Sequence, residues 1–592
     1  MKTLIFTLFF AIGSAYAAAP TATISCNRTS GAAPLTVICE SGGADADESR
    51  PFHTLLNTWN FGDTGAGNWA YGANTSLSKN GATGPVAAHL YETAGTYTIT
   101  VRVCDATTCA IDTETITVTD ISAANTVCVG VSAEPVAGSN GCPTSSNVAQ
   151  KSDGDFDAML TTQLGASSAC GAGGCKRILL QCGEAWLYST NTTVSASGAG
   201  LIGKFGTCAA PTVTGTANAN ALTFGANDWR VSGLSFIAFA SATTAQAIVT
   251  GASEQITVTG ASFSGFNYGI NATSSSPSEV GVFNSSFANA VGTSYGIFIT
   301  VTNYGAVLGN LINIGTGGTH GLRSNGCDKC VFSNNTAYAA SVSAMLIHGY
   351  NFTIASQYTQ KIVYSDNKIM GAATGTATGP VAFNPQNTTS DERIRDVIVE
   401  RNWCVAGAVQ NDCIGVEAVD VTLRNNIFNI TGGNAKRGVT ISNSNTSVGF
   451  PKTTRVNAYN NTGYDSAGST DFVVIRYFTN LDGTCTATAA NNLGYAPGSS
   501  NGVTIQNGGS CVVTLTTNSN NTQTRGTDPQ FTGATTAPIG FQVATTSYAA
   551  DGGTADFPAT SADFFNCTDK SGDIRIGAVV QQGQAQCRGV AQ

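Results

Sequence analysis

The chain has 592 residues, of which 42 % are hydrophobic and 11 % are charged, and its formal net charge is −9. Binding to nucleic acid needs a basic surface, so an acidic chain of this kind excludes nucleic acid as its expected partner. The ordinary hydrophobic share excludes a wholly disordered chain, and the low charge together with 68 glycines favours a turn-rich β-protein.

Residues 1–17 have the pattern of a secretory signal peptide. Lys2 precedes an apolar run over residues 4–12, and Ala15-Tyr16-Ala17 forms a cleavage site of the small-x-small type. No later apolar stretch is long enough to span a bilayer, so no membrane span is expected. The sequence therefore predicts a secreted, extracellular protein.

Eighteen cysteines in an exported chain indicate a framework of disulfides. Cys327-x-x-Cys330 would alternatively be half of a zinc site, but no second pair at ligand spacing accompanies it, so structural cysteines are favoured. Sequence does not separate the three possible pairings of Cys170, Cys175, Cys182 and Cys208. The predicted disulfides join Cys26 to Cys39, Cys104 to Cys109, Cys327 to Cys330, Cys404 to Cys413, Cys485 to Cys511 and Cys567 to Cys587.

Residues 18–120 are expected to form a separate β-sandwich, because short strands alternate with frequent turn signals. Four segments carry a family resemblance: residues 31–37 (Gly-Ala-Ala-Pro-Leu-Thr-Val), 59–63 (Trp-Asn-Phe-Gly-Asp), 89–91 (His-Leu-Tyr) and 95–101 (Gly-Thr-Tyr-Thr-Ile-Thr-Val). Together they resemble the PKD family of immunoglobulin-like extracellular sandwiches, although Asn60 stands where the family usually has aspartate. Trp59 and Phe61 alternate and should share the core. The resemblance implies spacing, adhesion or polysaccharide contact, and no catalysis.

Residues 121–215 have a different residue pattern and are expected to form the N-terminal cap and first coil of a solenoid. Spaced apolar residues over 153–164 predict a short helix. A solenoid end exposes unpaired strand edges and an open core, so a capping helix is physically required there.

A short pattern then recurs, with alternating apolar or small residues followed by a polar pair, as in residues 421–427 (Val-Thr-Leu-Arg-Asn-Asn-Ile). Copies begin 24 to 35 residues apart, and alternation of two residues means strands, so each coil should hold three short strands. The predicted copies begin at Trp229, Ile256, Val280, Ala306, Cys330, Ile362, Val397, Val421, Val456, Ala487 and Val513.

Asparagine occupies the fifth position after the start of the last seven copies. In stacked coils, each such asparagine would hydrogen-bond to its image in the next coil. The predicted ladder consists of Asn335, Asn367, Asn402, Asn426, Asn461, Asn492 and Asn518.

These repeats and the entry segment resemble right-handed parallel β-helix proteins of the pectate-lyase-like superfamily, which includes many polysaccharide lyases and some glycoside hydrolases. The predicted fold class is therefore all-β, with an N-terminal PKD β-sandwich and a right-handed parallel β-helix that has N- and C-terminal caps. The β-helix is expected over residues 216–525 and the C-terminal cap over residues 526–592.

A second strand in each coil carries the candidate site. Its aliphatic residues should point inward, so the residues one and three positions later should point outward in two columns. The aligned aliphatic residues are Ile270, Ile297, Leu322, Met345, Val381, Ile414, Val439, Val473 and Val503. The column three positions later contains Asn325, His348, Asn384, Glu417 and Arg476. Arg323 lies in the other column, and His320, Asp412 and Arg437 lie where the chain enters these strands.

The three longest insertions, at residues 349–361, 385–396 and 443–455, all follow this second strand. Loops that leave one edge would build the wall of a groove. One of them contains Arg393 and Arg395, in the densest charge cluster of the solenoid.

Elimination at a uronate needs a base beside the carboxyl group and a positive charge that neutralises it. His320, Arg323, His348 and Glu417 are therefore the candidate catalytic residues, and Asn384 and Glu417 would hold Ca²⁺ through oxygen atoms. The remaining candidates, which would bind substrate, are Asn325, Asn384, Asp412, Arg393, Arg395, Arg437 and Arg476.

The predicted function is that of a monomer that binds, and cleaves by β-elimination, a uronate-containing polysaccharide. A hydrolase needs two carboxylates, and Glu417 with Asp412 is the plausible pair, but the signature of the polygalacturonase-like branch is absent, so a lyase is favoured. A non-catalytic glycan-binding or adhesion protein stays open. A structural surface fibre also stays open, although the signal peptide and the cysteines count against it.

Overall fold

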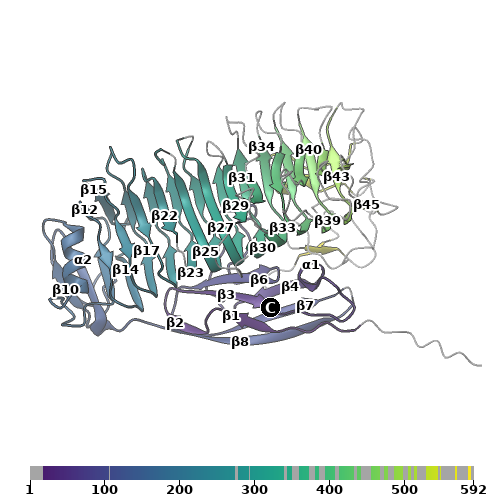
Figure 1. The fold of residues 1–592 in the computed structure, drawn as a ribbon. Helices are drawn as coiled ribbons and strands as arrows, with labels where there is room; N and C mark the ends of the chain where they lie inside the picture. The colour runs from purple at the N-terminus through teal and green to yellow at the C-terminus, as the bar shows by residue number, and fades with distance from the viewer. Residues whose placement is uncertain are drawn as a thin grey trace, which may run out of the picture.

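The chain folds into a long β-solenoid with a β-sandwich lying along one side (Figure 1). Within the residues that the structure describes, no helix is long and apolar enough to cross a membrane. This computed structural model describes residues 18–105, 107–273, 278–292, 294–315, 317–338, 343–349, 359–371, 381–385, 394–406, 412–431, 437–441, 455–466, 473–477, 486–497, 505–507, 512–515, 528–544, 547, 567–569 and 585–587.

The N-terminal sandwich has a three-stranded and a five-stranded sheet. As predicted, Trp59 and Phe61 are both buried in its core, with ring centroids 6.5 Å apart. A short helix, α1 (Pro51–Thr54), connects the two sheets. The three-stranded sheet has the order β1 (Ile24–Cys26), β3 (Leu35–Ser41) and β6 (Val86–Tyr91). The five-stranded sheet has the order β2 (Ser30–Ala32), β8 (Cys109–Thr119), β7 (Gly95–Cys104), β4 (Leu56–Asn60) and β5 (Gly81–Thr83).

A helix covers the first coils of the solenoid, as predicted. After the turn η1 (Ala123–Asn125), helix α2 (Phe156–Leu164) begins where Asp155 Oδ1 accepts a 2.9 Å hydrogen bond from Ala158 N. Phe156 and Leu160 are fully buried in the core that the first coils share. The helix therefore closes the apolar end of the stack.

Each coil contributes one strand to each of three parallel sheets. Sheet 1 consists of β10 (Asn147–Gln150), β9 (Thr126–Gly130), β11 (Arg177–Gln181), β14 (Gly200–Phe205), β17 (Trp229–Ser232), β20 (Ile256–Thr259), β23 (Ser278–Phe283), β25 (Tyr295–Leu308), β27 (His320–Ser333), β30 (Thr359–Ser365), β33 (Ile394–Glu400), β36 (Asp420–Arg424), β39 (Arg455–Tyr459), β42 (Thr486–Ala490) and β45 (Val512–Leu515). Sheet 2 consists of β12 (Ala185–Tyr188), β15 (Thr212–Gly215), β18 (Ser235–Ile237), β21 (Ser262–Ser264), β24 (Ser286–Ala288), β26 (Leu311–Asn313), β28 (Thr336–Tyr338), β31 (Lys368–Gly371), β34 (Trp403–Ala406), β37 (Ile427–Ile430), β40 (Thr462–Asp465) and β43 (Leu493–Tyr495).

Sheet 3 carries the second strand of the sequence pattern. The long strands β25 and β27 pass through sheet 3 first and then continue into sheet 1. The other members of sheet 3 are β13 (Thr193–Val194), β16 (Leu222–Phe224), β19 (Gln246–Val249), β22 (Tyr268–Ala272), β29 (Ser343–Gly349), β32 (Val381–Pro385), β35 (Asp412–Val416), β38 (Arg437–Ile441), β41 (Val473–Tyr477) and β44 (Ile505–Asn507).

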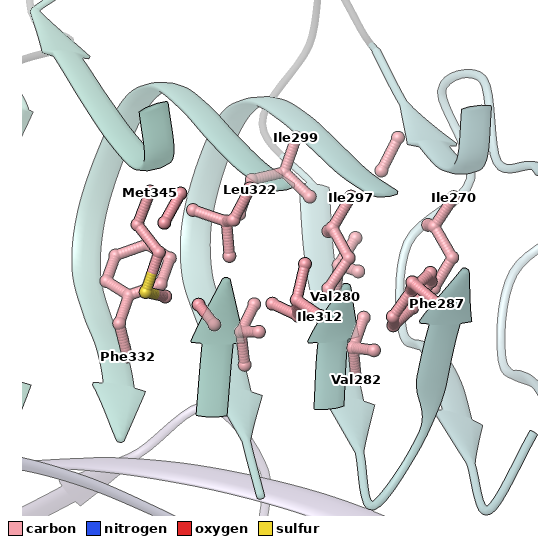
Figure 2. Close-up of a cluster of buried hydrophobic side chains, with 14 of the residues drawn as sticks. Ile270, Val280, Val282, Phe287, Ile297, Ile299, Ile312, Leu322, Phe332 and Met345 are labelled. Carbon is pink, nitrogen blue, oxygen red and sulfur yellow. The ribbon is translucent and has the colours of Figure 1, made fainter. Parts of the chain in front are cut away.

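The three sheets enclose a continuous apolar core (Figure 2). Ile270, Ile297, Leu322 and Met345 of sheet 3 all point inward, where they meet side chains of the other two sheets, such as Phe332. The predicted inward alignment is therefore confirmed from Ile270 to Val439, whereas Ile475 and Ile505 take the positions predicted for Val473 and Val503.

The asparagine ladder is confirmed from Asn335 to Asn492, and Asn518 lies outside the described residues. Each Oδ1 accepts hydrogen bonds from both the backbone N and the Nδ2 of the preceding ladder asparagine, at 2.9 to 3.1 Å. The second Nδ2 proton goes to a carbonyl oxygen of an earlier coil, for example from Asn335 to Val307 at 2.8 Å. Buried turns thus keep their polar groups paired.

The structure also corrects the ladder at its first end. Gly305, not Ala306, pairs with Cys330, so that copy of the repeat begins one residue earlier than predicted. With this shift, Asn310 joins the column, and its backbone N and Nδ2 each lie 3.0 Å from Asn335 Oδ1.

The polar pair of the repeat consists of the ladder asparagine and the residue before it. That preceding residue has a left-handed backbone conformation, which explains why it is usually asparagine or aspartate. Asparagine and aspartate tolerate this conformation better than most residues, because their short side chains bond locally. Positive φ angles of 53° to 57° occur at Asn334, Asp366, Arg401, Asn425, Asn460 and Asn491.

The sandwich packs lengthwise against sheet 1 through its three-stranded sheet (Figure 1). Alternate residues of β6 face two cores: Ala87 and Tyr91 face the sandwich interior, whereas Val86, Ala88 and Leu90 pack against the solenoid. The solenoid contributes Phe283, Ala306, Leu308, Val331 and Val363 to this apolar contact.

Buried charges connect the sandwich to the middle coils. Glu400 Oε1 accepts a 2.6 Å hydrogen bond from Thr83 of the sandwich, and Glu400 also bonds to Arg401 and Arg424 at 2.8 and 2.6 Å. Burial, the largest single influence, raises the pKa of Glu400, but the two guanidinium groups outweigh it and lower that pKa to about 2. Arg401 also binds both oxygens of Asp366 at 2.8 Å, although burial keeps the pKa of Asp366 above its usual value.

The segment that contains Phe531 and Phe541 packs against the outer face of sheet 2. Phe531 and Phe541, the latter in the turn η3 (Pro538–Phe541), contact Tyr464 edge-on at 6.0 and 5.9 Å between ring centroids. Asn429 Nδ2 donates a 2.8 Å hydrogen bond to Thr535 O.

Seven disulfides lie in the described residues, and four of them match predicted pairs. Because Cys327 and Cys330 form a disulfide, they are not available as ligands for the alternative zinc site. The four cysteines with open pairing form Cys170–Cys175 and Cys182–Cys208, and the seventh bond, Cys128–Cys142, was not predicted.

We expect disulfide mapping to find the two remaining predicted bonds. Cys485 and Cys511 lie outside the described residues, whereas Cys567 and Cys587 stand opposite each other where β46 (Cys567–Asp569) pairs with β47 (Ala585–Cys587). Mass spectrometry of peptides from the non-reduced protein should recover both pairs. Recovery of these cysteines as free thiols would contradict the prediction.

Replacing Asn402 with alanine should destabilise the solenoid by about 3 kcal/mol, because it leaves several buried polar groups without partners. These include the backbone N–H of Asn367 and the carbonyl oxygen of Tyr364, whereas Asn426 Oδ1 keeps the backbone N–H of residue 402. Chemical unfolding should show the loss. The half-buried Asn457 on sheet 1 is the matched control, and an equal effect of Asn457→Ala would contradict a special role for the ladder.

Acid should weaken the structure through Glu400. Its pKa is about 2 in the folded protein, below its usual 4.5, so its stabilising effect is complete above pH 4.5 and is lost as the pH falls toward 2. The melting temperature should therefore fall less between pH 5 and about 3 in Glu400→Gln than in the unmodified protein, while at pH 7 the variant should be less stable by about 3 kcal/mol. The exposed Glu134→Gln is the control, and identical acid profiles for all three proteins would refute the assignment.

Candidate functional site

The residues of the predicted polar column occupy matching register positions on sheet 3. Strand register pairs Thr300 with Asn325, Asn325 with His348, and His348 with Asn384. Glu417 continues the line, because its backbone N donates a 2.7 Å hydrogen bond to Phe383 O, next to Asn384. Parallel register thus brings these residues onto adjacent coils. The side chains of His348 and Asn384 lie outside the described part of the chain.

Arg323 is held firmly beside this column. Its Nε donates a 3.1 Å hydrogen bond to Asn325 Oδ1, and its Nη1 donates one of 3.0 Å to Tyr295 Oη. The guanidinium carbon also lies 5.6 and 5.4 Å from the ring centroids of Tyr295 and Phe298. Asn325 itself is only 3 % exposed, so its role here is to position Arg323.

The sequence interpretation missed a group of aromatic rings on the same face. Tyr268, Tyr295 and His320 occupy equivalent positions on successive coils, with ring centroids 5.2 and 5.5 Å apart. Phe298 stacks on Tyr295 at 5.1 Å. A signal was present in the sequence, since each member of the column stands two residues before an aligned aliphatic residue. His320 is 6 % exposed because it packs into this column.

Asp412 and Arg437 also meet on this sheet. They are register partners, and Asp412 Oδ1 accepts hydrogen bonds from Thr440 Oγ1 at 2.9 Å and from Arg437 Nη1 at 3.4 Å. A carboxylate engaged in this way is poorly suited to pair with Glu417 in hydrolysis.

Two predicted arginines take different positions from those expected. Val439 pairs with Ile475 rather than Val473, so Arg476 lies beside Thr440 in the first outward column, two residues from its predicted alignment. Arg395 lies on β33 of sheet 1, not in the predicted loop over residues 385–396. Arg393 and most of the three predicted wall-forming loops lie outside the described residues.

A second charged cluster lies where α1 meets the solenoid. The potential ligand atoms of His53, Asp396 and Asp420 lie within 4.8 Å of one another, which is a spacing that a metal ion could bridge. However, Arg455 binds both oxygens of Asp420 at 2.7 and 2.6 Å, and Thr422 Oγ1 lies 3.0 Å from His53 Nδ1. Burial lowers the pKa of His53 despite its contact with Asp396. These donors fit a docking contact better than a metal centre.

Residues 21–118 match the PKD domain model, so the sandwich is a PKD domain. A long parallel β-solenoid follows it. No curated protein matches the chain.

Solved structures with a similar fold include an alginate lyase from Paenibacillus sp. str. FPU-7, with a TM-score of 0.30, 14 % identity, and coverage of 61 % of this chain and 95 % of that one. The GH136 lacto-N-biosidase from Eubacterium ramulus gives a TM-score of 0.36 and 10 % identity, and covers 65 % and 68 %. The A-module of the mannuronan C-5 epimerase AlgE4 from Azotobacter vinelandii gives 0.32 and 12 %, and covers 61 % and 95 %. Similarity at this level concerns the course of the chain alone.

Proposed function

We propose that the outer face of sheet 3 binds an extracellular, uronate-containing polysaccharide and cleaves it by β-elimination. The observation that carries this proposal is the unbroken register of Asn325, His348 and Asn384 on adjacent coils, with Arg323 held beside them. Coils repeat about every 4.8 Å, so a linear polymer along the axis would meet one set of polar side chains after another.

The proposed chemistry needs one base, one acid and a positive charge near the carboxylate. The base removes the proton from C5 of the uronate, the bond from C4 to the glycosidic oxygen breaks, and that oxygen takes up a proton. A double bond between C4 and C5 remains. We assign His348 as the base, because it lies in the middle of the column and histidine is the residue type whose unperturbed pKa lies near neutral pH. Arg323 supplies positive charge one coil away.

Calcium ligation by Asn384 and Glu417 remains part of the proposal. Their oxygen atoms belong to the ligand class that Ca²⁺ prefers, and the two residues come from adjacent coils. A bound Ca²⁺ would add positive charge beside a substrate carboxylate. Glu417 would then orient the ion, and Asn384 would complete its contact with the protein.

Non-catalytic glycan binding is the second candidate, and one observation favours it. Asn325 and His320 are only 3 % and 6 % exposed, so neither reaches far toward a polymer. A rigid polar and aromatic face of this kind could bind a glycan without cutting it. For either function we propose secretion, in keeping with seven disulfides and an extracellular type of domain. The predicted signal peptide, residues 1–17, lies outside the described residues.

Pectate, alginate and glycosaminoglycans should be incubated with the protein, with and without a chelator, while ultraviolet absorbance reports the unsaturated product. We expect one of these polymers to be cut, and His348→Ala to lower kcat by about 100-fold or more while binding persists. Loss of activity on chelation, restored by Ca²⁺, would support the proposed ligands.

Thr214→Ala, a half-buried residue on the outer side of sheet 2, is the control and should leave the rate unchanged. Tight binding of a polymer without any unsaturated product would favour the non-catalytic alternative. If His348→Ala and Glu417→Ala alter neither cleavage nor binding, the site is elsewhere.

A further inference from the structure

The aromatic rings on sheet 3 extend the polar column toward the N-terminal coils. Tyr268 on β22 and Tyr295 on β25 lie in line with His320, and Phe298 stacks against both tyrosines. Tyr268, Tyr295 and Phe298 are half-buried, so parts of these rings remain at the surface. Stacking on neighbours removes most of their rotamer freedom, so a ligand would lose little entropy in ordering them.

Among the described residues, no carboxylate pairs with the cation of Arg323. Its partners are the neutral amide of Asn325 and the neutral hydroxyl of Tyr295, and it forms no ion pair with any carboxylate that the structure describes. These bonds use Nε and Nη1, which leaves the two N–H groups of Nη2 for an incoming acceptor. The fork geometry of a guanidinium group matches a carboxylate.

The surrounding surface favours an anion as well. From β19 to β27, the outward residues of sheet 3 that the structure describes include no acid, although the whole chain carries a net charge of −9. The polar residues here include Gln246 and Asn271 as well as Arg323 and Asn325, and Asn271 Nδ2 donates a 2.7 Å hydrogen bond to Gln246 Oε1. Burial raises the pKa of Tyr268, which keeps its hydroxyl a neutral donor.

We infer that Tyr268, Tyr295, Phe298 and Arg323, here called the arginine–aromatic row, form a subsite for a carboxylate-bearing sugar. Arg323 binds the carboxylate, the tyrosine hydroxyls bind sugar hydroxyls, and Phe298 gives apolar contact. This deepens the proposed function and rests on its assumption that sheet 3 is the glycan-binding face. It adds that the bound chain continues from the His348 coil toward β22, and that the row selects polyuronates over neutral glycans.

The test measures the affinity of the full-length protein for labelled oligouronates and for their methyl esters, which lack the charge. The unmodified protein should bind the acid form at least about 10-fold more tightly. Arg323→Gln should weaken binding of the acid form by about 30-fold and leave the ester nearly unaffected, while Arg323→Lys should lose less. Tyr295→Phe, which removes the hydroxyl that orients Arg323, should cost about 5-fold.

Tyr338→Ala is the matched control, because Tyr338 is a 37 % exposed aromatic residue on sheet 2. Melting curves identify any variant that fails to fold, in which case Tyr295→Phe, the smallest change, decides. Equal binding of acid and ester by the unmodified protein, or unchanged acid binding in both Arg323→Gln and Tyr295→Phe, overturns the inference. Selective acid binding without any cleavage supports the row and contradicts the proposed elimination, so the two failures are distinguishable.

Discussion

The side-chain amide that each coil donates to the turn of its neighbour is the interaction on which the rest of this structure depends. A strand pair can slip by two residues without changing which face is apolar, but the ladder allows one alignment, since the Oδ1 of Asn367 must meet the backbone N of Asn335. Because these amides are buried and fully hydrogen-bonded, any other strand register would leave them unpaired. One register is therefore strongly preferred. The register of His348 with Asn325 and Asn384 on the neighbouring coils is consistent with this alignment.

Docking of the PKD domain depends on the same regularity. Because successive strands of sheet 1 present their outward residues in rows, β6 can run along several coils and bury Val86, Ala88 and Leu90. Glu400 and Arg401 stand at the turn before the ladder position, so the buried ionic group is held by the same turn geometry. The domain thus packs along the solenoid over several coils.

Much of the fold could be predicted from the sequence, because a structural feature that every coil shares appears as a repeat in the sequence. The ladder, the inward aliphatic residues and the disulfides with short separations follow directly from spacing. Arg476 was misaligned because the sheet 3 strands at Val439 and Val473 carry no ladder asparagine of their own, and the chain between Asn461 and Val473 differs in length from the chain between Asn426 and Val439. The rings of Tyr268 and Tyr295 were missed because aromatic residues within strands usually read as core. The docking of β6 could have been suspected, because β6 has apolar residues on both of its faces. The surface it contacts could not be predicted, because that surface is built from residues of several coils that are far apart in the sequence.

A solenoid with three faces offers three long surfaces, and two of them are already in use in the described structure. The PKD domain lies over sheet 1, and the segment around Phe531 and Phe541 lies over part of sheet 2. A polymer approaching the remaining face would therefore meet the molecule in one rotational orientation about its axis. The sandwich on sheet 1 would then determine which side of the protein can face an extended matrix.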